Sequence, residues 1–95
     1  IEGFLPVDDF LAHLKLGLGK SAFQRGAFDE AERWFREVVE THPQSEPAPE
    51  AQYWAGVARY KAKGDASALA ETARAFMARY SDSAWAKKAS VWRAA

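Results

Sequence analysis

One pattern of small and bulky residues occurs twice in this 95-residue chain. Gly19 corresponds to Gly56 at an offset of 37 positions, and Gly26 corresponds to Gly64 at an offset of 38. The same alignment pairs Phe23 with Tyr60, Ala31 with Leu69, Ser45 with Ser83, Ala51 with Ala89 and Trp54 with Trp92. A repeat of this length is typical of stacked structural units that bury a face against their neighbours. We therefore expect two such units followed by a partial third.

Turn-forming residues divide the chain into five segments. The breaks fall at 3–6, 26, 42–49, 64–65 and 81–83. Between them, apolar residues recur at steps of three and four, which is the spacing of one helix face. The sequence predicts helices over 7–24, 29–41, 49–63, 67–80 and 83–95. Only the first few residues alternate like a strand, so the predicted fold class is all-α.

The predicted helices carry apolar residues suited to a core. In the first helix one apolar stripe is expected from Phe10, Leu11, Leu14, Leu18, Ala22 and Phe23. In the second and fourth helices the inward residues are expected to be Ala31, Trp34, Phe35, Val38, Val39, Leu69, Ala73, Phe76 and Met77. Gly17 and Gly19 each cost a helix about 1 kcal/mol relative to alanine. They indicate either the close approach of another helix or a break between two helices.

The charge and cysteine content argue against several functions. Thirteen basic and thirteen acidic residues cancel, and neither sign forms a block. Binding to nucleic acid or anionic lipid normally needs a basic patch, so no nucleic-acid partner is expected. No apolar run is long enough to span a bilayer. Cysteine is absent, so these residues contain no disulfide, thiolate metal site or redox motif, and cysteine usage gives no indication of compartment.

The sequence shows no catalytic, metal or cofactor motif. His13 and His42 are the only histidines, and neither has a compact carboxylate cluster at ligand spacing. No serine stands in a Gly-x-Ser-x-Gly turn. The acidic residues of the second helix alternate with Arg33 and Arg36, which is typical of a solvated face with helical ion pairs. An enzyme acting through its carboxylates is therefore the least favoured of three functional hypotheses, of which the other two are given below. No cofactor is expected.

The first repeat resembles the tetratricopeptide repeat. The residues that carry the resemblance are Leu18, Gly19, Ala22, Phe23, Gly26, Ala31, Phe35, Val38 and Pro43. The second repeat departs from the pattern, since Ala73 stands where a large aromatic residue is usual and Ser81 replaces the proline. The phrases at 41–45 and 80–83 resemble the turns of a bacterial subgroup. The resemblance implies a right-handed α-solenoid with repeats at 11–43 and 47–81 and a terminal helix at 83–95.

In this family the first helix of each repeat lines a concave groove that binds a protein or peptide. Carried over, the groove would contain His13, Leu16, Lys20, Phe23, Glu50, Tyr53, Trp54, Val57, Tyr60, Lys61, Lys88, Val91 and Trp92. Alternatively, Trp54 and Trp92 fill gaps between helix pairs. The five-residue clamp of some relatives is not reproduced here. An uncapped apolar end at Val91 and Trp92 would favour a homodimer through the C-terminal helix.

Residues 1–14 have a character of their own. A Gly-aromatic-x-Pro turn is followed by two aspartates and Phe-Leu-x-x-Leu, which resembles the end of a thioredoxin-like domain. Residues 1–10 would then be the remnant of that upstream domain, and the chain its C-terminal extension. The alternative is a plain helix start with Pro6 at its entry. The leading functional hypothesis is a non-catalytic interaction or oligomerisation module attached to a thioredoxin-like protein, and the second is a periplasmic cell-envelope adaptor.

Overall fold

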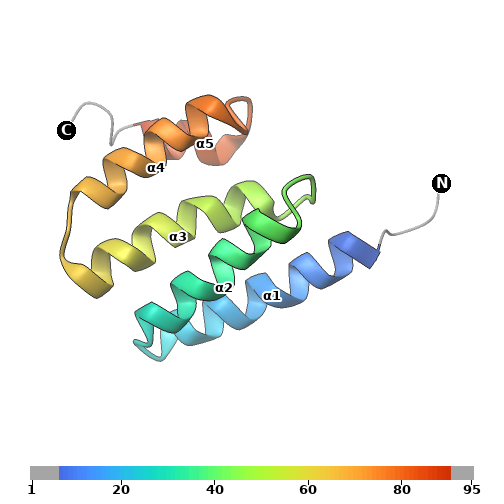
Figure 1. Ribbon diagram of the computed structural model, residues 1–95, viewed down its shortest axis with the longest axis horizontal. Coiled ribbons are helices and arrows are strands. Elements are labelled where there is room, and N and C mark those ends of the chain that lie inside the picture. The colour runs from blue at the N-terminus through green and yellow to red at the C-terminus, as the bar shows by residue number, and fades with distance from the viewer. Residues whose placement is uncertain (1–6, 91–95) are drawn as a thin grey trace.

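The computed structural model describes residues 7–90, with side chains from Phe10 onward, and every regular element in this range is an α-helix (Figure 1). The helices are α1 (Val7–Gln24), α2 (Phe28–Thr41), α3 (Ala48–Lys63), α4 (Ser67–Ala78) and α5 (Ala84–Ala89). The prediction of an all-α fold is therefore confirmed.

Helix boundaries follow the turn residues of the sequence. Gly26 and Gly64 have φ values of 82° and 64°, a left-handed conformation that glycine adopts without steric cost. They allow the short turns that separate α1 from α2 and α3 from α4. α4 ends two residues earlier than predicted because Arg79 is extended, with φ −149° and ψ 139°. The part of the predicted last helix beyond Ser90 lies outside the described residues.

Helix α3 is the centre of the molecule. It packs against α2 on one side and α4 on the other, and it also contacts α1 and α5 (Figure 1). Within the described residues α3 separates α2 from α4, whose backbones do not approach each other closely. The molecule is flat, with extents of 42 × 30 × 17 Å, because the helices lie side by side. This arrangement places residues of α1, α2, α3 and α5 close enough to share one site.

Alanine dominates the core. The buried residues include Ala12, Ala22, Ala31, Ala48, Ala51, Ala55, Ala58, Ala68, Ala73 and Ala89. The larger side chains of Phe35, Val38 and Phe76 are almost fully buried and fill the volume between the helices. Small side chains let helix backbones approach closely, so this core depends on tight packing more than on side-chain bulk.

Two glycines mark equivalent close contacts in the two helix pairs. A Cβ atom added to Gly19 would lie 2.6 Å from the Phe35 ring, and one added to Gly56 would overlap the Thr72 side chain. In both pairs the contact joins α-helical residues sixteen positions apart, 19 with 35 and 56 with 72. Thr72, one position before Ala73, therefore takes the place that Phe35 has in the first pair. The predicted alternative of a helix break at Gly17 and Gly19 is wrong, since α1 is continuous.

Helix α1 has two apolar faces and not one stripe. Ala12, Leu16 and Ala22 are buried against α2 and α3. Four apolar side chains on the opposite side are exposed: Phe10 58%, Leu11 37%, Leu14 52% and Leu18 40%. The sequence predicted a single stripe because apolar residues on both faces follow one another at spacings of three or four positions. None of the helices described in residues 7–90 is long and apolar enough to cross a membrane.

Two other residues predicted to face inward also differ. Met77 is 60% exposed, because the buried face of α4 is formed by Ala68, Thr72, Ala73 and Phe76. Trp34 is only partly buried and lines a shallow hollow with three charged residues of its own helix, Glu30, Arg33 and Glu37.

Tyr80 connects the end of the second helix pair to the turn that follows the first. Its hydroxyl donates a hydrogen bond of 2.6 Å to the carbonyl oxygen of Pro43. Its backbone has a φ of 65°, which is unfavourable for a bulky residue. The ring also packs edge-on against Phe76, with centroids 6.5 Å apart. These contacts hold Tyr80 in an unfavourable backbone conformation.

Candidate functional site

Five aromatic rings from four helices form a connected group, which we call the aromatic surface. Its members are Phe23 of α1, Phe28 of α2, Tyr53 and Trp54 of α3, and Trp85 of α5. Ring centroids are 5.1 Å apart for Phe28 and Phe23, and 5.5 Å apart for Phe23 and Trp54. Trp85 lies 5.1 Å from Tyr53 and 6.4 Å from Trp54. Most of these pairs are edge-to-face, the geometry that aromatic quadrupoles favour.

All five rings are partly buried, so each presents some area to solvent. Clusters of aromatic side chains that are rigid and half exposed are typical of protein interfaces, because they supply contact area at little entropic cost. The aromatic surface is therefore the strongest candidate for a binding site among the described residues.

A polar network crosses the middle of the aromatic surface. The Glu50 carboxylate accepts a hydrogen bond of 3.2 Å from Nε1 of Trp54 and forms an ion pair with Lys20 of α1. The Trp54 indole N–H thus has a partner, as a partly buried indole requires. The network fixes the orientation of the Trp54 ring and ties α1 to α3.

Two lysines lie over rings at opposite ends of the aromatic surface. The ammonium of Lys61 lies 6.0 Å from the centroid of Phe28, and that of Lys88 lies 4.7 Å from the centroid of Trp85. Both side chains are exposed. Neither forms an ion pair with a carboxylate in the part of the chain that the structure describes. The aromatic surface therefore carries positive charge at both ends.

A small pocket opens beside Trp54. It has a volume of about 240 Å³ and is lined by Lys20, Phe23, Gln24, Phe35 and Trp54. Ligand pockets for drug-sized molecules are usually about 300–1,000 Å³. This pocket is below that range and suits a single side chain of a partner.

Most of the predicted groove residues lie in or beside the aromatic surface. Phe23, Tyr53 and Trp54 are members. Glu50 accepts the hydrogen bond from Trp54 and pairs with Lys20, while Lys61 lies over Phe28 and Lys88 over Trp85. Val57 is partly buried and Tyr60 exposed on the same helix, α3.

The remaining predictions fared differently. Leu16 was wrongly placed in the groove: it is only 7% exposed, because it lies on the face of α1 that carries Ala12 and Gly19 and packs into the core. His13 is exposed and lies 3.5 Å from Glu46, apart from the aromatic contacts. Val91 and Trp92 lie outside the described residues.

Phe28 and Trp85 were missed. Phe28 begins α2, so a rule that takes groove residues only from the first helix of each repeat excludes it. Trp85 was not among the predicted groove residues, yet Lys88 follows it by three positions, the spacing at which neighbours on a helix meet. This spacing was the available signal that Trp85 shares a surface with a predicted groove residue.

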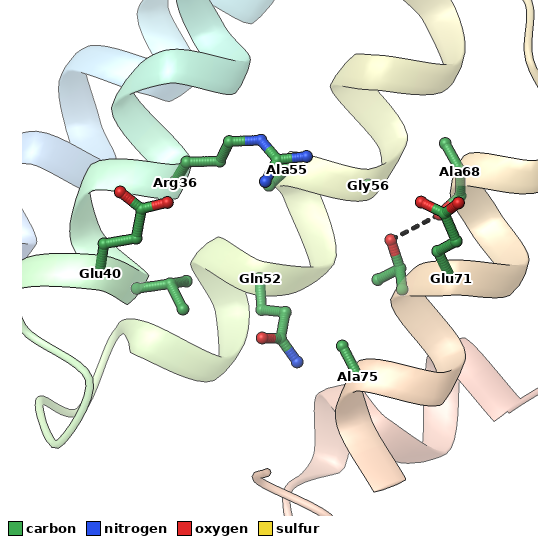
Figure 2. A pocket seen from close by; sticks show the side chains of 10 residues that line it. Arg36, Glu40, Gln52, Ala55, Gly56, Ala68, Glu71 and Ala75 are labelled. Carbon is green, nitrogen blue, oxygen red and sulfur yellow. Dashed lines mark hydrogen bonds between the residues drawn. The ribbon is translucent and has the colours of Figure 1, made fainter. Parts of the chain in front are cut away.

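A second pocket lies on the other side of α3, between α2 and α4. It has a volume of about 230 Å³, and its floor consists of small residues (Figure 2). Figure 2 shows Arg36 and Glu40 reaching in from α2, Gln52 from α3 and Glu71 from α4. Arg36 is already bound to Glu32 at 2.6 Å, whereas the buried Nε2 of Gln52 has no hydrogen-bond partner. The hydroxyl of Thr72, which also lines the pocket, donates to the Ala68 carbonyl at 2.8 Å, and the mixed charges around it indicate no particular ligand.

One carboxyl group has a clear pKa shift. Asp65 precedes α4 and accepts hydrogen bonds from the side chain and the backbone N–H of Ser67, at 2.7 and 3.0 Å, which lower the pKa of the Asp65 carboxyl. These bonds belong to a local turn just before α4, which explains the shift without any catalytic role. Among the described residues no group of three or more histidine, aspartate or glutamate side chains could hold a metal ion.

Comparison with known proteins adds no relative: no family model, no curated protein and no solved structure matches this chain. Its function must therefore be argued from its own residues.

Proposed function

We propose that this chain is a non-catalytic protein–protein interaction module that binds its partner through the aromatic surface. The single observation that carries the proposal is the contact of five partly buried rings from four helices. The side-chain-sized pocket beside Trp54 supports it, because interface anchors insert into such pockets.

The proposal is tested by peptide capture with matched tryptophan variants. Trp85→Ala removes a ring of the aromatic surface, and Trp34→Ala removes a partly buried tryptophan from the hollow on α2. If the proposal holds, an immobilised array of defined peptides retains the wild-type chain and Trp34→Ala but loses Trp85→Ala. Circular dichroism confirms that each variant is folded. Equal retention of the two variants would contradict the proposed site.

We further propose that the two helix pairs are tetratricopeptide units. The residues of the first repeat and the matching glycine contacts at 19–35 and 56–72 support this. Crystallography of the chain tests the proposal. In the crystal structure, α1–α2 should superpose on α3–α4 by one rotation and translation along a right-handed stack. A stack of the opposite hand would contradict the assignment.

The attachment to a thioredoxin-like protein is also a proposal. It is supported by the resemblance of residues 1–14 and by the four exposed apolar side chains of α1, which an upstream domain could cover. The gene sequence preceding Ile1 tests it: a Cys-x-x-Cys motif supports a thioredoxin-like domain. A signal peptide with a coiled coil would favour the cell-envelope adaptor instead.

Homodimer formation through the C-terminal helix stays a prediction. Its test is the molar mass in solution of the wild-type chain and of Trp92→Ala, the latter expected to be monomeric.

A further inference from the structure

The charge on the aromatic surface is unbalanced. Lys20 and Glu50 neutralise each other in the middle of the surface. Lys61 and Lys88 lie over the outer rings, and neither pairs with a carboxylate among the side chains described, residues 10–90. A lysine held over a ring face keeps its other N–H groups available, so it can bind an anion without leaving the ring. Both ends of the surface are therefore suited to negatively charged groups.

The distances between the rings limit how a partner can fit. The rings from Phe28 to Trp85 are linked by steps of 5.1, 5.5 and 6.4 Å, and the pocket beside Trp54 opens between the ends. An extended chain advances roughly 3.3 Å per residue, so a segment of about five residues is long enough to follow all three steps. One side chain at the centre of such a segment would enter the pocket, and the side chains about two positions away on each side would reach the lysines.

We propose that the aromatic surface binds an extended acidic peptide segment in which one bulky apolar residue stands between two carboxylates. The inference rests on the proposed function and specifies the partner of the same site. The apolar residue occupies the pocket lined by Phe23, Phe35 and Trp54, and the carboxylates pair with Lys61 and Lys88. Because both lysines are exposed, their contribution is sensitive to salt.

The test uses three labelled peptides that differ only in charge. Each has leucine at its centre and glycine elsewhere, with glutamate, glutamine or lysine on both sides about two positions from the leucine. Fluorescence anisotropy measures the Kd of each for the intact chain at low and at high salt. We expect the glutamate peptide to bind roughly two- to tenfold more tightly than the glutamine peptide, as two exposed ion pairs allow, and high salt to reduce the difference.

Reversing the charge of the two lysines tests whether they cause the preference for the acidic peptide. The double variant Lys61→Glu with Lys88→Glu should invert the order, so that the lysine peptide binds best. Lys87→Glu is the matched control: Lys87 precedes Lys88 but lines a separate hollow between α4 and α5, so the wild-type order should persist. Inversion with a positively charged peptide also rules out simple damage to the fold, because a damaged site would bind none of them.

The outcomes separate the two proposals. If the glutamine peptide binds as tightly as the glutamate peptide and Trp85→Ala abolishes both, the acidic preference is wrong and the interaction site stands. If Lys87→Glu changes the order as much as the double variant, the placement of the carboxylates is wrong. If no peptide binds at millimolar concentration, the proposed interaction site fails together with this inference.

Discussion

At the scale of single residues, Gly17 and Gly56 differ in what surrounds them. Both stand inside helices, where glycine is less favourable than alanine. A Cβ atom at Gly17 would meet nothing within 4 Å, whereas one at Gly56 would overlap Thr72, whose hydroxyl donates to the Ala68 carbonyl at 2.8 Å. Gly56 is thus required by the packing of α3 on α4, and Gly17 is not.

This contrast gives the first prediction. Gly56→Ala should lower the free energy of unfolding by about 1–3 kcal/mol, the usual range for overpacking. Gly17→Ala should raise it by up to about 1 kcal/mol, because alanine favours the helix. Urea denaturation of the two variants measures both values. A stabilised Gly56→Ala would contradict the close contact with Thr72.

A second prediction concerns the Tyr80 hydroxyl. Tyr80→Phe removes the hydrogen bond to Pro43 and should lower the free energy of unfolding by about 1 kcal/mol. Tyr60→Phe is the control, since Tyr60 is exposed on α3 and should change stability by less than about 0.5 kcal/mol. Thermal or urea unfolding of both variants measures these changes in the free energy of unfolding. Equal stabilities would mean that the hydroxyl bond makes no net contribution.

At the scale of the helices, the turn residues made the boundaries predictable. Glycine, proline and aspartate act locally, so α1, α2 and α3 begin and end within one residue of the predicted positions. The faces of α1 were less predictable. Apolar residues cover both sides of this helix, and periodicity alone does not tell which side meets α2. For that reason Leu14 and Leu18 were grouped with the core stripe although they are exposed.

The start of α4 provides a prediction about pH. Hydrogen bonds from Ser67 lower the pKa of the Asp65 carboxyl in the folded chain. The unfolded chain lacks these bonds and binds the proton more tightly. Asp65 therefore stabilises the fold above its ordinary pKa of 3.8, and this contribution is lost as the pH falls through the lowered folded value.

Melting temperatures across this acidic range test the prediction. The wild-type chain should lose stability faster on acidification than Asp65→Asn, whose side-chain oxygen can still accept the hydrogen bonds from Ser67 but does not titrate. The two curves should differ most at neutral pH and converge below the folded pKa. Parallel curves would contradict the assignment of the shift to Asp65.

At the scale of the whole molecule, the aromatic surface could be predicted only in part. The residues of α3 were found because the repeat pattern aligns Trp54 and its neighbours with the first helix of a unit. Phe28 and Trp85 were missed because their positions depend on how α2 and α5 pack against α3, which no local pattern encodes. Leu16 was misplaced for the same reason, since the rotation of α1 decides whether it faces the core.

The aromatic surface draws its five rings from α1, α2, α3 and α5, so an isolated helix pair would contain at most part of it. Any molecule that engages the complete set must therefore select the native chain over the unfolded one. By mass action such a ligand increases the apparent melting temperature as its concentration rises above Kd. Occupancy of the site can thus be followed as a thermal shift, without labelling either component.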